Sequence, residues 1–430
     1  MREIVGYTEK LLALYPRIGG FRKKQTYLVL LQNSMELRPT GGFIGSVLLI
    51  SFVDGRVETL EVQDVYTADG QLKGHVDPPL AIREILGNEH WYLRDSNWDP
   101  DFTESGAKAA WFYEKEMGVH VDGVIGISLP MVTKLLVVTG PIELLDFNER
   151  ISAGNFFAKS LLYTQTDFFP GSTQKKDFLG ALTNALLTRI TTDRSLSAGA
   201  LLHAVTESIQ SRDIQFFFPD SQLSSLIAQW RWGGDVTLEA CDVVARQIPC
   251  KGDGLGIIEA NLGVNKTNFF VTREALSQIT IDPDGTLEHA LTLKILNDAP
   301  ILADGTGAYQ LYMRVLVPLA AEVREVSVGG ALIPLRTIKT QSAPPASYWY
   351  EESTSLYKAI HIPVTVRPQE TSQGALSWKL YNAVTFDATT MYQLTIRKQS
   401  GVSEAPWHVI LRYPYSWSSS SECGIAKVSV

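Results

Sequence analysis

The sequence predicts an α/β domain followed by an all-β domain, and three observations lead to this fold class. Apolar runs typical of buried strands alternate with helical segments over roughly the first 240 residues. After about residue 252, the segments alternate polar and apolar residues or are rich in β-branched and aromatic residues, which favours a β-sandwich. The length of 430 residues also exceeds what one hydrophobic core usually supports.

These patterns divide the chain into four consecutive parts. We expect an N-terminal helix over residues 1–20, an α/β domain over 21–240, a linker over 241–258 and a β-sandwich over 259–430. The glycine-rich stretch GDGLGIIEANLG favours the linker, because it lacks the GxGxxG spacing of a dinucleotide site and strands follow it.

The first predicted strands follow one another closely. Residues 26–31, TYLVLL, form a continuous apolar run and predict a buried strand. Residues 43–53 and 56–66 predict two more strands, and Asp54-Gly55 between them is a two-residue hairpin signal. This hairpin makes the predicted sheet mixed, within a layered α/β/α domain.

The rest of the α/β domain alternates between helices and strands. Helices are predicted over 78–86, 103–118, 130–140, 152–163, 175–190, 195–211 and 221–232, and strands over 121–129, 141–147 and 213–220. The helix after residue 103 has Thr103 or Ser105 as its expected N-cap, and Gly118 follows its end.

The composition argues against several classes of protein. With 38 Lys+Arg against 46 Asp+Glu, the net charge is −8, and no basic patch with interleaved aromatic residues favours a nucleic-acid partner. The longest apolar region is interrupted by Asp122, Pro130 and Lys134, so no transmembrane helix is predicted. The seven histidines form no HxxxH or HxH pair, which gives a His-ligated metalloenzyme little support.

The three cysteines leave two interpretations open. No CxxC motif is present, so a structural zinc site is not expected. Cys241 and Cys250 either form a disulfide, if the compartment is oxidising, or are two ordinary thiols. Cys423 stands alone near the end.

The loop ELRPTGG, between two apolar runs, is a candidate anion site. Arg38 follows the first buried strand, and Thr40, Gly41 and Gly42 come directly after it. Glycines let backbone N–H groups approach an anion, and a guanidinium matches a phosphate or carboxylate. The alternative is an internal salt bridge between Arg38 and Glu36 or an aspartate.

Residues 93–102, LRDSNWDPDF, form the densest polar and aromatic cluster. Asp95 and Asp99 could hold Mg²⁺ through oxygen ligands while Arg94 faces a phosphate, with Trp98 between them. The same residues also suit an ordinary turn and a helix cap.

Two further aspartates stand at the end of the third predicted strand. Asp64 and Asp69 lie where the loops of an open α/β sheet usually carry function. An Asx turn is the alternative interpretation of Asp69.

Several segments together resemble an uncharacterised bacterial family, the domain of unknown function numbered 4012. The resemblance lies in YLVLLQNSMELRPTGGFIGS, DVYTADGQL, WYLRDSNWDPDF, VDGVIGISLPMVTKLL, TGPIEL and ANLGVNKTNFFV. Members of that family typically carry an N-terminal membrane anchor, and most of the protein lies outside the cytoplasm. The resemblance therefore implies a membrane-anchored, extracytoplasmic cell-envelope protein. The sequence printed here contains no such anchor, and the helix over 1–20 would follow it.

The same segments are similar, more distantly, to the LytR-CpsA-Psr enzymes. Those enzymes transfer glycopolymers from a polyprenyl-pyrophosphate lipid to the cell wall, with arginines on the pyrophosphate and aspartates on Mg²⁺. The partners this resemblance implies are a lipid-linked glycan or pyrophosphate and a cell-wall polymer, and the implied cofactor is Mg²⁺. The site residues that it and the loops above suggest are Arg38, Asp64, Arg94 and Asp95 for catalysis, Glu36, Thr40, Gly41, Gly42 and Trp98 for ligand binding, and Asp64, Asp95 and Asp99 for the metal.

The sequence departs from those enzymes at two places. Arg38-Pro39-Thr40 stands where they have Arg-Ser-Asp, and Gln63-Asp64 stands where they have Arg-Asp. One metal ligand and one arginine are therefore missing, with Glu36 and Arg94 as candidate replacements. Since each electrostatic contact to a reacting phosphate is worth several kcal/mol, transfer activity is not assured by the resemblance.

Two functions follow as expectations. The first is binding, and in the enzyme case transfer, of a polyprenyl-(pyro)phosphate-linked glycan or similar anionic ligand, with a lipid tunnel formed by apolar residues of the sheet and helices. The second is a non-catalytic adhesion or scaffolding module with a degenerate transferase-like domain. A long tunnel ending at Arg38 favours the first, and a filled core there favours the second.

Overall fold

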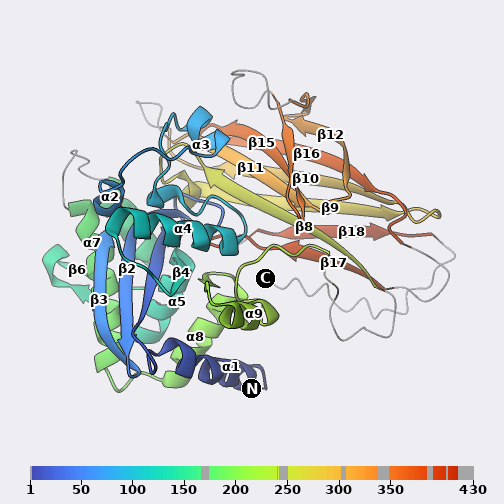
Figure 1. The fold of residues 1–430 in the computed structure, drawn as a ribbon. Coiled ribbons are helices and arrows are strands. Elements are labelled where there is room, and N and C mark those ends of the chain that lie inside the picture. The colour runs from blue at the N-terminus through green and yellow to red at the C-terminus, as the bar shows by residue number, and fades with distance from the viewer. Residues whose placement is uncertain are drawn as a thin grey trace. The chain divides into compact units, whose positions relative to one another are not determined.

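The structure is a computed structural model. It describes residues 2–165, 174–239, 241, 250–301, 307–336, 348–384, 391–402 and 405–414. The chain forms two compact units (Figure 1). The first, which we call the α/β unit, contains Met1–Pro79 and Glu89–Asp235, and the second, the β unit, contains Leu80–Asn88 and Val236–Val430.

The α/β unit is built on a mixed sheet with the strand order β3-β2-β1-β4-β7. Its strands are β1 (Gln25–Asn33), β2 (Phe43–Val53), β3 (Arg56–Asp64), β4 (Gly123–Ser128) and β7 (Ile214–Phe217). Only the β1–β4 pair is parallel among these described strands, and the predicted hairpin joins β2 to β3. The prediction of a mixed sheet is confirmed.

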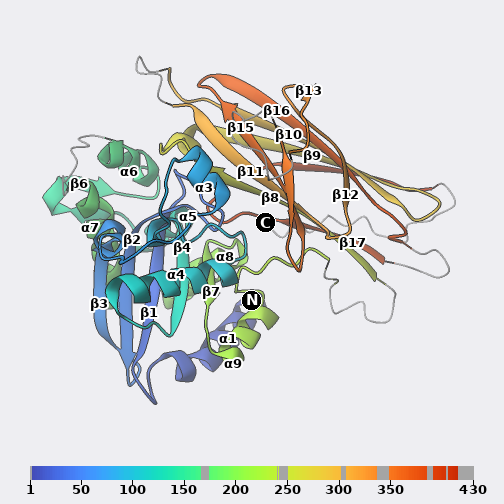
Figure 2. The same cartoon turned by 45° about the horizontal axis from the view of Figure 1, so that its top comes forward.

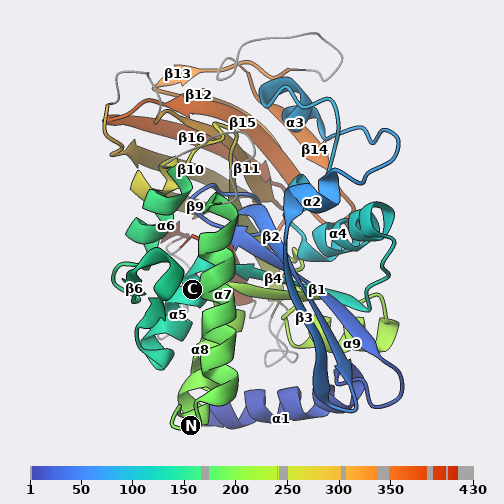
Figure 3. The same ribbon diagram turned by 90° about the vertical axis from the view of Figure 1, so that its left-hand side faces the viewer.

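Helices cover both faces of this sheet. They are α1 (Arg2–Ile18), α2 (Val65–Asp69), α4 (Phe102–Met117), α5 (Leu129–Thr139), α6 (Phe156–Gln165), α7 (Gln174–Thr192), α8 (Ala198–Gln210) and α9 (Ser221–Gln229), with a small hairpin of β5 (Ile142–Leu144) and β6 (Glu149–Ile151). Figure 3 shows the sheet between α4 on one side and α5, α7 and α8 on the other. Alternate residues of β1 serve the two faces, since Leu28 packs in the α4 core and Tyr27 in the core with α8 and α9. Within the described residues, no helix is both long and apolar enough to cross a membrane.

Two local predictions in the α/β unit are wrong by a few residues. The third strand ends at Asp64, where the Asp64 carboxylate accepts a hydrogen bond from the Tyr66 backbone and starts α2. The N-cap of α4 is Asp101, whose side chain accepts from the Thr103 N–H at 2.8 Å. An aspartate before the expected cap takes that role because it can reach the free N–H groups of the first turn.

The β unit is a sandwich of two sheets, as predicted (Figure 2). One sheet has the order β13-β12-β16-β10-β9-β18 and the other β14-β15-β11-β8-β17. The strands are β8 (Cys250–Asn261), β9 (Val271–Ile281), β10 (Leu287–Asn297), β11 (Tyr309–Val317), β12 (Glu322–Val328), β13 (Ala331–Leu332), β14 (Tyr350–Ser353), β15 (Lys358–Val366), β16 (Glu370–Leu380), β17 (Met391–Arg397) and β18 (Trp407–Arg412). The short helix α3 (Leu80–Ile85) also belongs to this unit.

The sandwich core comes from the inward-facing residues of both sheets. Along β10 the buried residues alternate with more exposed ones, and Leu291, Leu293 and Ile295 enter the core. The last two strands, β17 and β18, pair in parallel with β8 and β9, and not as antiparallel neighbours.

A buried ion pair crosses from β8 to β9 in the β unit. Arg273 Nε and Nη2 donate to the two carboxylate oxygens of Glu259 at 2.5 and 3.0 Å. The Tyr309 hydroxyl donates to the same carboxylate at 2.5 Å, and Gln399 bonds both backbone groups of Glu259. The Glu259 side chain is 2% exposed, so its charge depends on these partners.

The predicted linker is wrong over residues 250–258, which form most of strand β8. The glycines that suggested a linker have a packing role instead. A Cβ at Gly252 would overlap the Glu239 backbone, and one at Gly254 would overlap the Leu238 backbone. These glycines therefore let the preceding chain lie directly against the strand.

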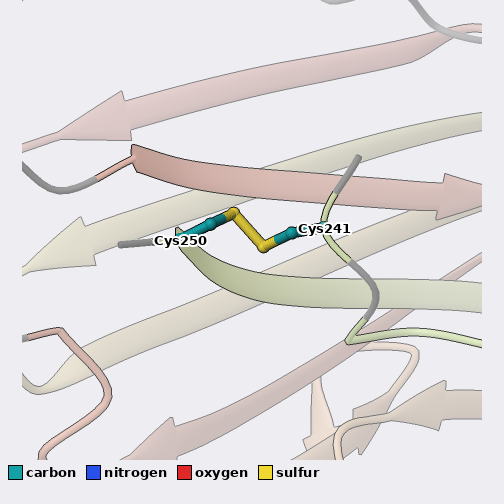
Figure 4. Close-up of a disulfide and its surroundings, with 2 residues drawn as sticks. All are labelled: Cys241 and Cys250. Carbon is teal, nitrogen blue, oxygen red and sulfur yellow. A yellow bond between two sulfur atoms is a disulfide. The ribbon is translucent and has the colours of Figure 1, made fainter. Parts of the chain in front are cut away.

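Cys241 and Cys250 form a disulfide at the start of β8 (Figure 4). Of the two interpretations that the sequence left open, this confirms the first. Cys423 lies outside the described residues.

Candidate functional site

Three loops that the sequence analysis considered separately meet in the α/β unit. They are residues 34–42 after β1, residues 64–72 after β3, and residues 91–102, which contain a 3₁₀ turn at Leu93–Asp95. Arg38 contacts Asp95 between the first and the third loop, and Arg94 contacts Asp69 between the third and the second.

Arg38 is buried and fully engaged by its surroundings. Its Nε donates to Asp95 at 3.1 Å, its Nη1 to the Leu37 carbonyl at 3.2 Å, and its Nη2 to Glu36 at 3.3 Å. The Arg38 side chain is 2% exposed, and those of Glu36 and Asp95 are each 4% exposed. Arg38 therefore forms the internal salt bridge that was the alternative to an anion site.

The residues after Arg38 close the loop on itself. Thr40 donates to Gln32 at 2.8 Å, and Asn97 donates to Gln32 and to the Gly42 carbonyl at 2.6 and 2.8 Å. Gly42 has φ 157°, and a Cβ there would overlap the Asn33 backbone, so glycine is required for this close approach. The Gly41 N–H donates to the Arg38 carbonyl at 3.0 Å instead of facing an anion. Every residue from 32 to 42 is buried.

Arg94 differs from Arg38 because it reaches the surface. Its Nη1 donates to Asp69 at 2.8 Å, and its Nε lies 3.6 Å from Asp95. Its guanidinium lies 4.4 Å from the ring centre of Tyr92 and 5.6 Å from that of Tyr66. The Arg94 side chain is 18% exposed, and its Nη2 has no partner among the described residues. We call Arg94, Tyr66 and Tyr92 the arginine rim.

The three proposed metal ligands serve separate purposes. Asp64 caps α2, Asp99 accepts from the Asp101 N–H at 2.8 Å, and Asp95 faces both arginines. Among the residues that the structure describes, no group of three or more His, Cys, Asp or Glu side chains is arranged to hold a metal ion. Asp64, Asp95 and Asp99 thus do not fit a Mg²⁺ site. Trp98 is 9% exposed and packs as a buried side chain.

A small cavity lies at the carboxyl ends of the parallel strands β1 and β4. Residues of β1, β4, α5, α6 and α7 line it, and Gln32 and Ser128 supply polar atoms. Its volume of ≈ 40 Å³ is room for a few water molecules. The predicted lipid tunnel ending at Arg38 needs far more space than this cavity offers. Within the described residues, the neighbouring helices pack a filled core around Met35, Phe156 and Phe178.

Two buried carboxyl groups, Asp69 and Glu116, belong to the same charge cluster, and of these the sequence indicated Asp69 but not Glu116. Burial raises the pKa of Asp69 to about 6, although Arg94 opposes that shift. Burial, and then the charge of Asp69, raises the pKa of Glu116 to about 8. Glu116 accepts from the Leu93 N–H at 3.2 Å, and it lies on α4, where the helical pattern gave no reason to expect a buried carboxyl.

Replacing Glu116 with glutamine should make the α/β unit less sensitive to pH. Because the folded-state pKa of Glu116 lies above its unfolded value, its contribution to stability is fully present below about pH 4.5 and is lost as the pH rises through 8. We expect Glu116→Gln to match the wild type near pH 4 and to exceed it at pH 8 by on the order of 2–3 kcal/mol. Chemical denaturation at both pH values measures this difference.

Glu104→Gln is the matched control, since Glu104 lies exposed on the same helix. Its stability should follow the wild-type pH dependence. If the free energy of unfolding depended on pH in the same way for Glu116→Gln and the wild type, ionisation of Glu116 would not destabilise the folded protein, and the prediction would be wrong.

The comparison with protein families finds one match. Residues 22–165 match the family described as "Protein of unknown function (DUF4012)". This region contains all three loops of the charge cluster, and it confirms the resemblance for this part of the chain. Among curated proteins, none matches.

Several solved structures are weakly similar to parts of the chain. TagV of B. subtilis has 10% identity and a TM-score of 0.30, and the match covers 50% of this chain and 80% of TagV. Protein gbs0355 of Streptococcus agalactiae has 15% identity and a TM-score of 0.30, with 48% and 72% covered. A putative nutrient binding protein of Legionella pneumophila has 11% identity and a TM-score of 0.18, with 26% and 39% covered, so this chain spans well under half of it. At these TM-scores, none of the similarities supports an argument about function.

Proposed function

We propose that this chain is an extracytoplasmic cell-envelope protein whose α/β unit binds an anionic glycan or its pyrophosphate without transferring it. The observation that carries this proposal is the state of the two arginines. Arg38 is enclosed by carboxylates, whereas Arg94 is partly exposed, and no described residue accepts a hydrogen bond from its Nη2. We therefore expect Arg94 to be the residue that binds the anion.

The arginine rim suits an anionic ligand for physical reasons. Asp69 and the Tyr92 ring hold the guanidinium in one orientation, so little side-chain entropy is lost when a ligand binds. The two N–H groups of Nη2 can donate to a phosphate or carboxylate oxygen. The exposed Tyr66 ring, 53% exposed, offers a flat apolar face beside that charge.

Other features favour binding over transfer. Asp64, Asp95 and Asp99 are engaged separately, so among the residues that the structure describes we find no carboxylate set placed to bring Mg²⁺ to a pyrophosphate. The cavity of ≈ 40 Å³ between β1, β4 and α5–α7 is too small for a polyprenyl chain, so we expect the polar part of a lipid-linked glycan to be the part that the described residues contact. The Cys241–Cys250 disulfide supports an oxidising, extracytoplasmic compartment.

Binding of inorganic pyrophosphate, farnesyl pyrophosphate and farnesol tests the proposal. Calorimetry on the wild type should detect similar affinity for the two pyrophosphates and none for farnesol. Arg94→Gln should weaken binding about 10–100-fold, the loss expected for a charged hydrogen bond. EDTA should change nothing, because no metal takes part.

Arg56→Gln is the control for general charge effects, because Arg56 is exposed at the other end of β3. It should bind like the wild type, and near-UV circular dichroism checks that each variant is folded. Equal binding by Arg94→Gln and the wild type, or binding that needs Mg²⁺, would overturn the proposal.

A second candidate is a non-catalytic adhesion or scaffolding module. The closed network of Glu36, Arg38 and Asp95 favours it, since internal carboxylates occupy the guanidinium that a ligand would otherwise contact. The absence of binding to every probe above would favour this candidate.

A further inference from the structure

His75 and His90, which are 15 positions apart in the sequence, come together on the surface of the α/β unit. Their Nδ1 atoms are 3.0 Å apart, and the two rings meet edge to face with centres 4.4 Å apart. A backbone hydrogen bond from the Trp91 N–H to the Val76 carbonyl, 2.9 Å long, holds the two chain segments side by side. The backbone thus fixes the pair, which does not depend on two flexible side chains meeting by chance.

This spacing is the one that a shared metal ion requires. Imidazole nitrogens bind transition metals at about 2.0–2.1 Å, so two of them on one ion lie roughly 2.8–3.4 Å apart for angles between a right angle and the tetrahedral angle. The 3.0 Å between the His75 and His90 nitrogens falls within this range. Both residues are exposed, so an ion can enter from solvent.

Asp77 gives His75 the orientation and the protonation state of a metal ligand. Its Oδ1 lies 3.0 Å from Nε2 of His75, on the far side of the ring from His90. A proton on Nε2 that is donated to this carboxylate leaves Nδ1 with its lone pair facing His90. A carboxylate behind a ligating histidine raises the basicity of the ligand and fixes its tautomer.

We propose that His75 and His90 bind one divalent transition-metal ion of the Zn²⁺, Ni²⁺ and Cu²⁺ class through their Nδ1 atoms. With His75 Nε2 protonated toward Asp77, the tautomer that completes the contact has His90 Nδ1 donating to His75 Nδ1, and on metal binding that proton would move to Nε2 of His90 through solvent. The described residues offer no third His, Cys, Asp or Glu in a suitable arrangement, so water fills the remaining positions. Imidazole ligands exclude Mg²⁺ and make Cu²⁺ the tightest-bound ion of the series.

The ion would act as a clip at a particular place in the chain. Residues 75–77 and 90–91 stand at the two ends of the excursion that includes Leu80–Asn88. Cross-linking the ends of this excursion limits the conformations that the segment between them can adopt in the unfolded chain. Because the ion binds the folded pair, the melting temperature should rise with the logarithm of the ion concentration once that concentration exceeds the Kd.

Titration of the untagged full chain with CuSO₄, followed by calorimetry and electron paramagnetic resonance, tests this site. The wild type should bind one Cu²⁺, and its spectrum should show two nitrogen ligands. His75→Ala and His90→Ala should each bind Cu²⁺ at least 10-fold more weakly than the wild type and should each lose one nitrogen ligand. Asp77→Asn should weaken binding about 10-fold through its effect on His75.

His120→Ala is the matched control, because His120 is also exposed and lies near a carboxylate, Glu114, at 3.5 Å. It should keep the wild-type affinity, spectrum and copper-dependent rise in melting temperature. If the double variant His75→Ala/His90→Ala binds Cu²⁺ with the same affinity and the same number of nitrogen ligands as the wild type, the proposed site is wrong.

Discussion

Arg38→Met should lower the stability of the α/β unit by about 3–5 kcal/mol, the cost of leaving buried charges without their partner. The substitution keeps most of the side-chain volume but removes the nearest counter-charge of Glu36 and Asp95, which are each 4% exposed, and leaves Asp95 with the more distant Arg94 Nε at 3.6 Å. It also removes the donor to the Leu37 carbonyl. The loss is large because Glu36 and Asp95 have no access to solvent that could replace the guanidinium.

Differential scanning calorimetry measures this effect on the transition of the α/β unit. The transition should fall by roughly 6–20 °C for a unit of this size. Arg56→Met, at an exposed position of the same unit, should stay within about 0.5 kcal/mol of the wild type.

A neutral version of the network separates charge from packing. The triple variant Glu36→Gln, Arg38→Met, Asp95→Asn removes all three charges of this network at once. It should be considerably more stable than Arg38→Met alone. If the Arg38→Met protein were as stable as the wild type, the ion pairs of Arg38 would not stabilise the fold. A ligand-binding role for Arg38 would then be the better interpretation.

Arg273→Met should have an effect of similar size in the β unit. It leaves Glu259 charged and 2% exposed, with the Tyr309 hydroxyl as the remaining hydrogen-bond partner of the carboxylate among the described residues. Since burial of an unpaired carboxylate costs several kcal/mol, we expect a loss of about 3–5 kcal/mol. Thermal unfolding of the β unit, followed by calorimetry, measures the change.

Arg367→Met provides the comparison for Arg273→Met. Arg367 is 75% exposed and lies 3.7 Å from Glu370, so its pair should contribute less than about 1 kcal/mol. Equal effects of the two substitutions would mean that burial of the Glu259 carboxylate is not what makes its pair important.

The elements that the sequence predicted well are those determined by local patterns. Asp54 and Gly55 both adopt positive φ, 49° and 74°. These are the angles of the two-residue hairpin turn that the sequence predicted between β2 and β3. The alternation along residues 287–297 likewise produced β10 with its inner and outer faces as expected. In such segments the side-chain period and the turn residues depend on near neighbours alone.

The state of the site could not be predicted from the sequence in the same way. The sequence placed Glu36 and Arg38 two residues apart but gave no measure of burial, and burial decides whether an arginine serves a fold or a ligand. The partners Asp69 of Arg94 and His90 of His75 lie 25 and 15 positions away, so only the folded chain reveals them. The Gly252 and Gly254 stretch misled us because glycine suits both a flexible connection and a tight contact.

The passage of the chain between its two compact units limits how the protein can be dissected. It changes unit after Pro79, again after Asn88 and once more after Asp235, so neither half is a single uninterrupted stretch. A truncated gene that starts at codon 236 omits α3, and with it the Glu84 carboxylate that lies 3.4 Å from Arg336. A faithful excision of the sandwich has to graft residues 80–88 back on, by circular permutation or by co-expression as a separate peptide.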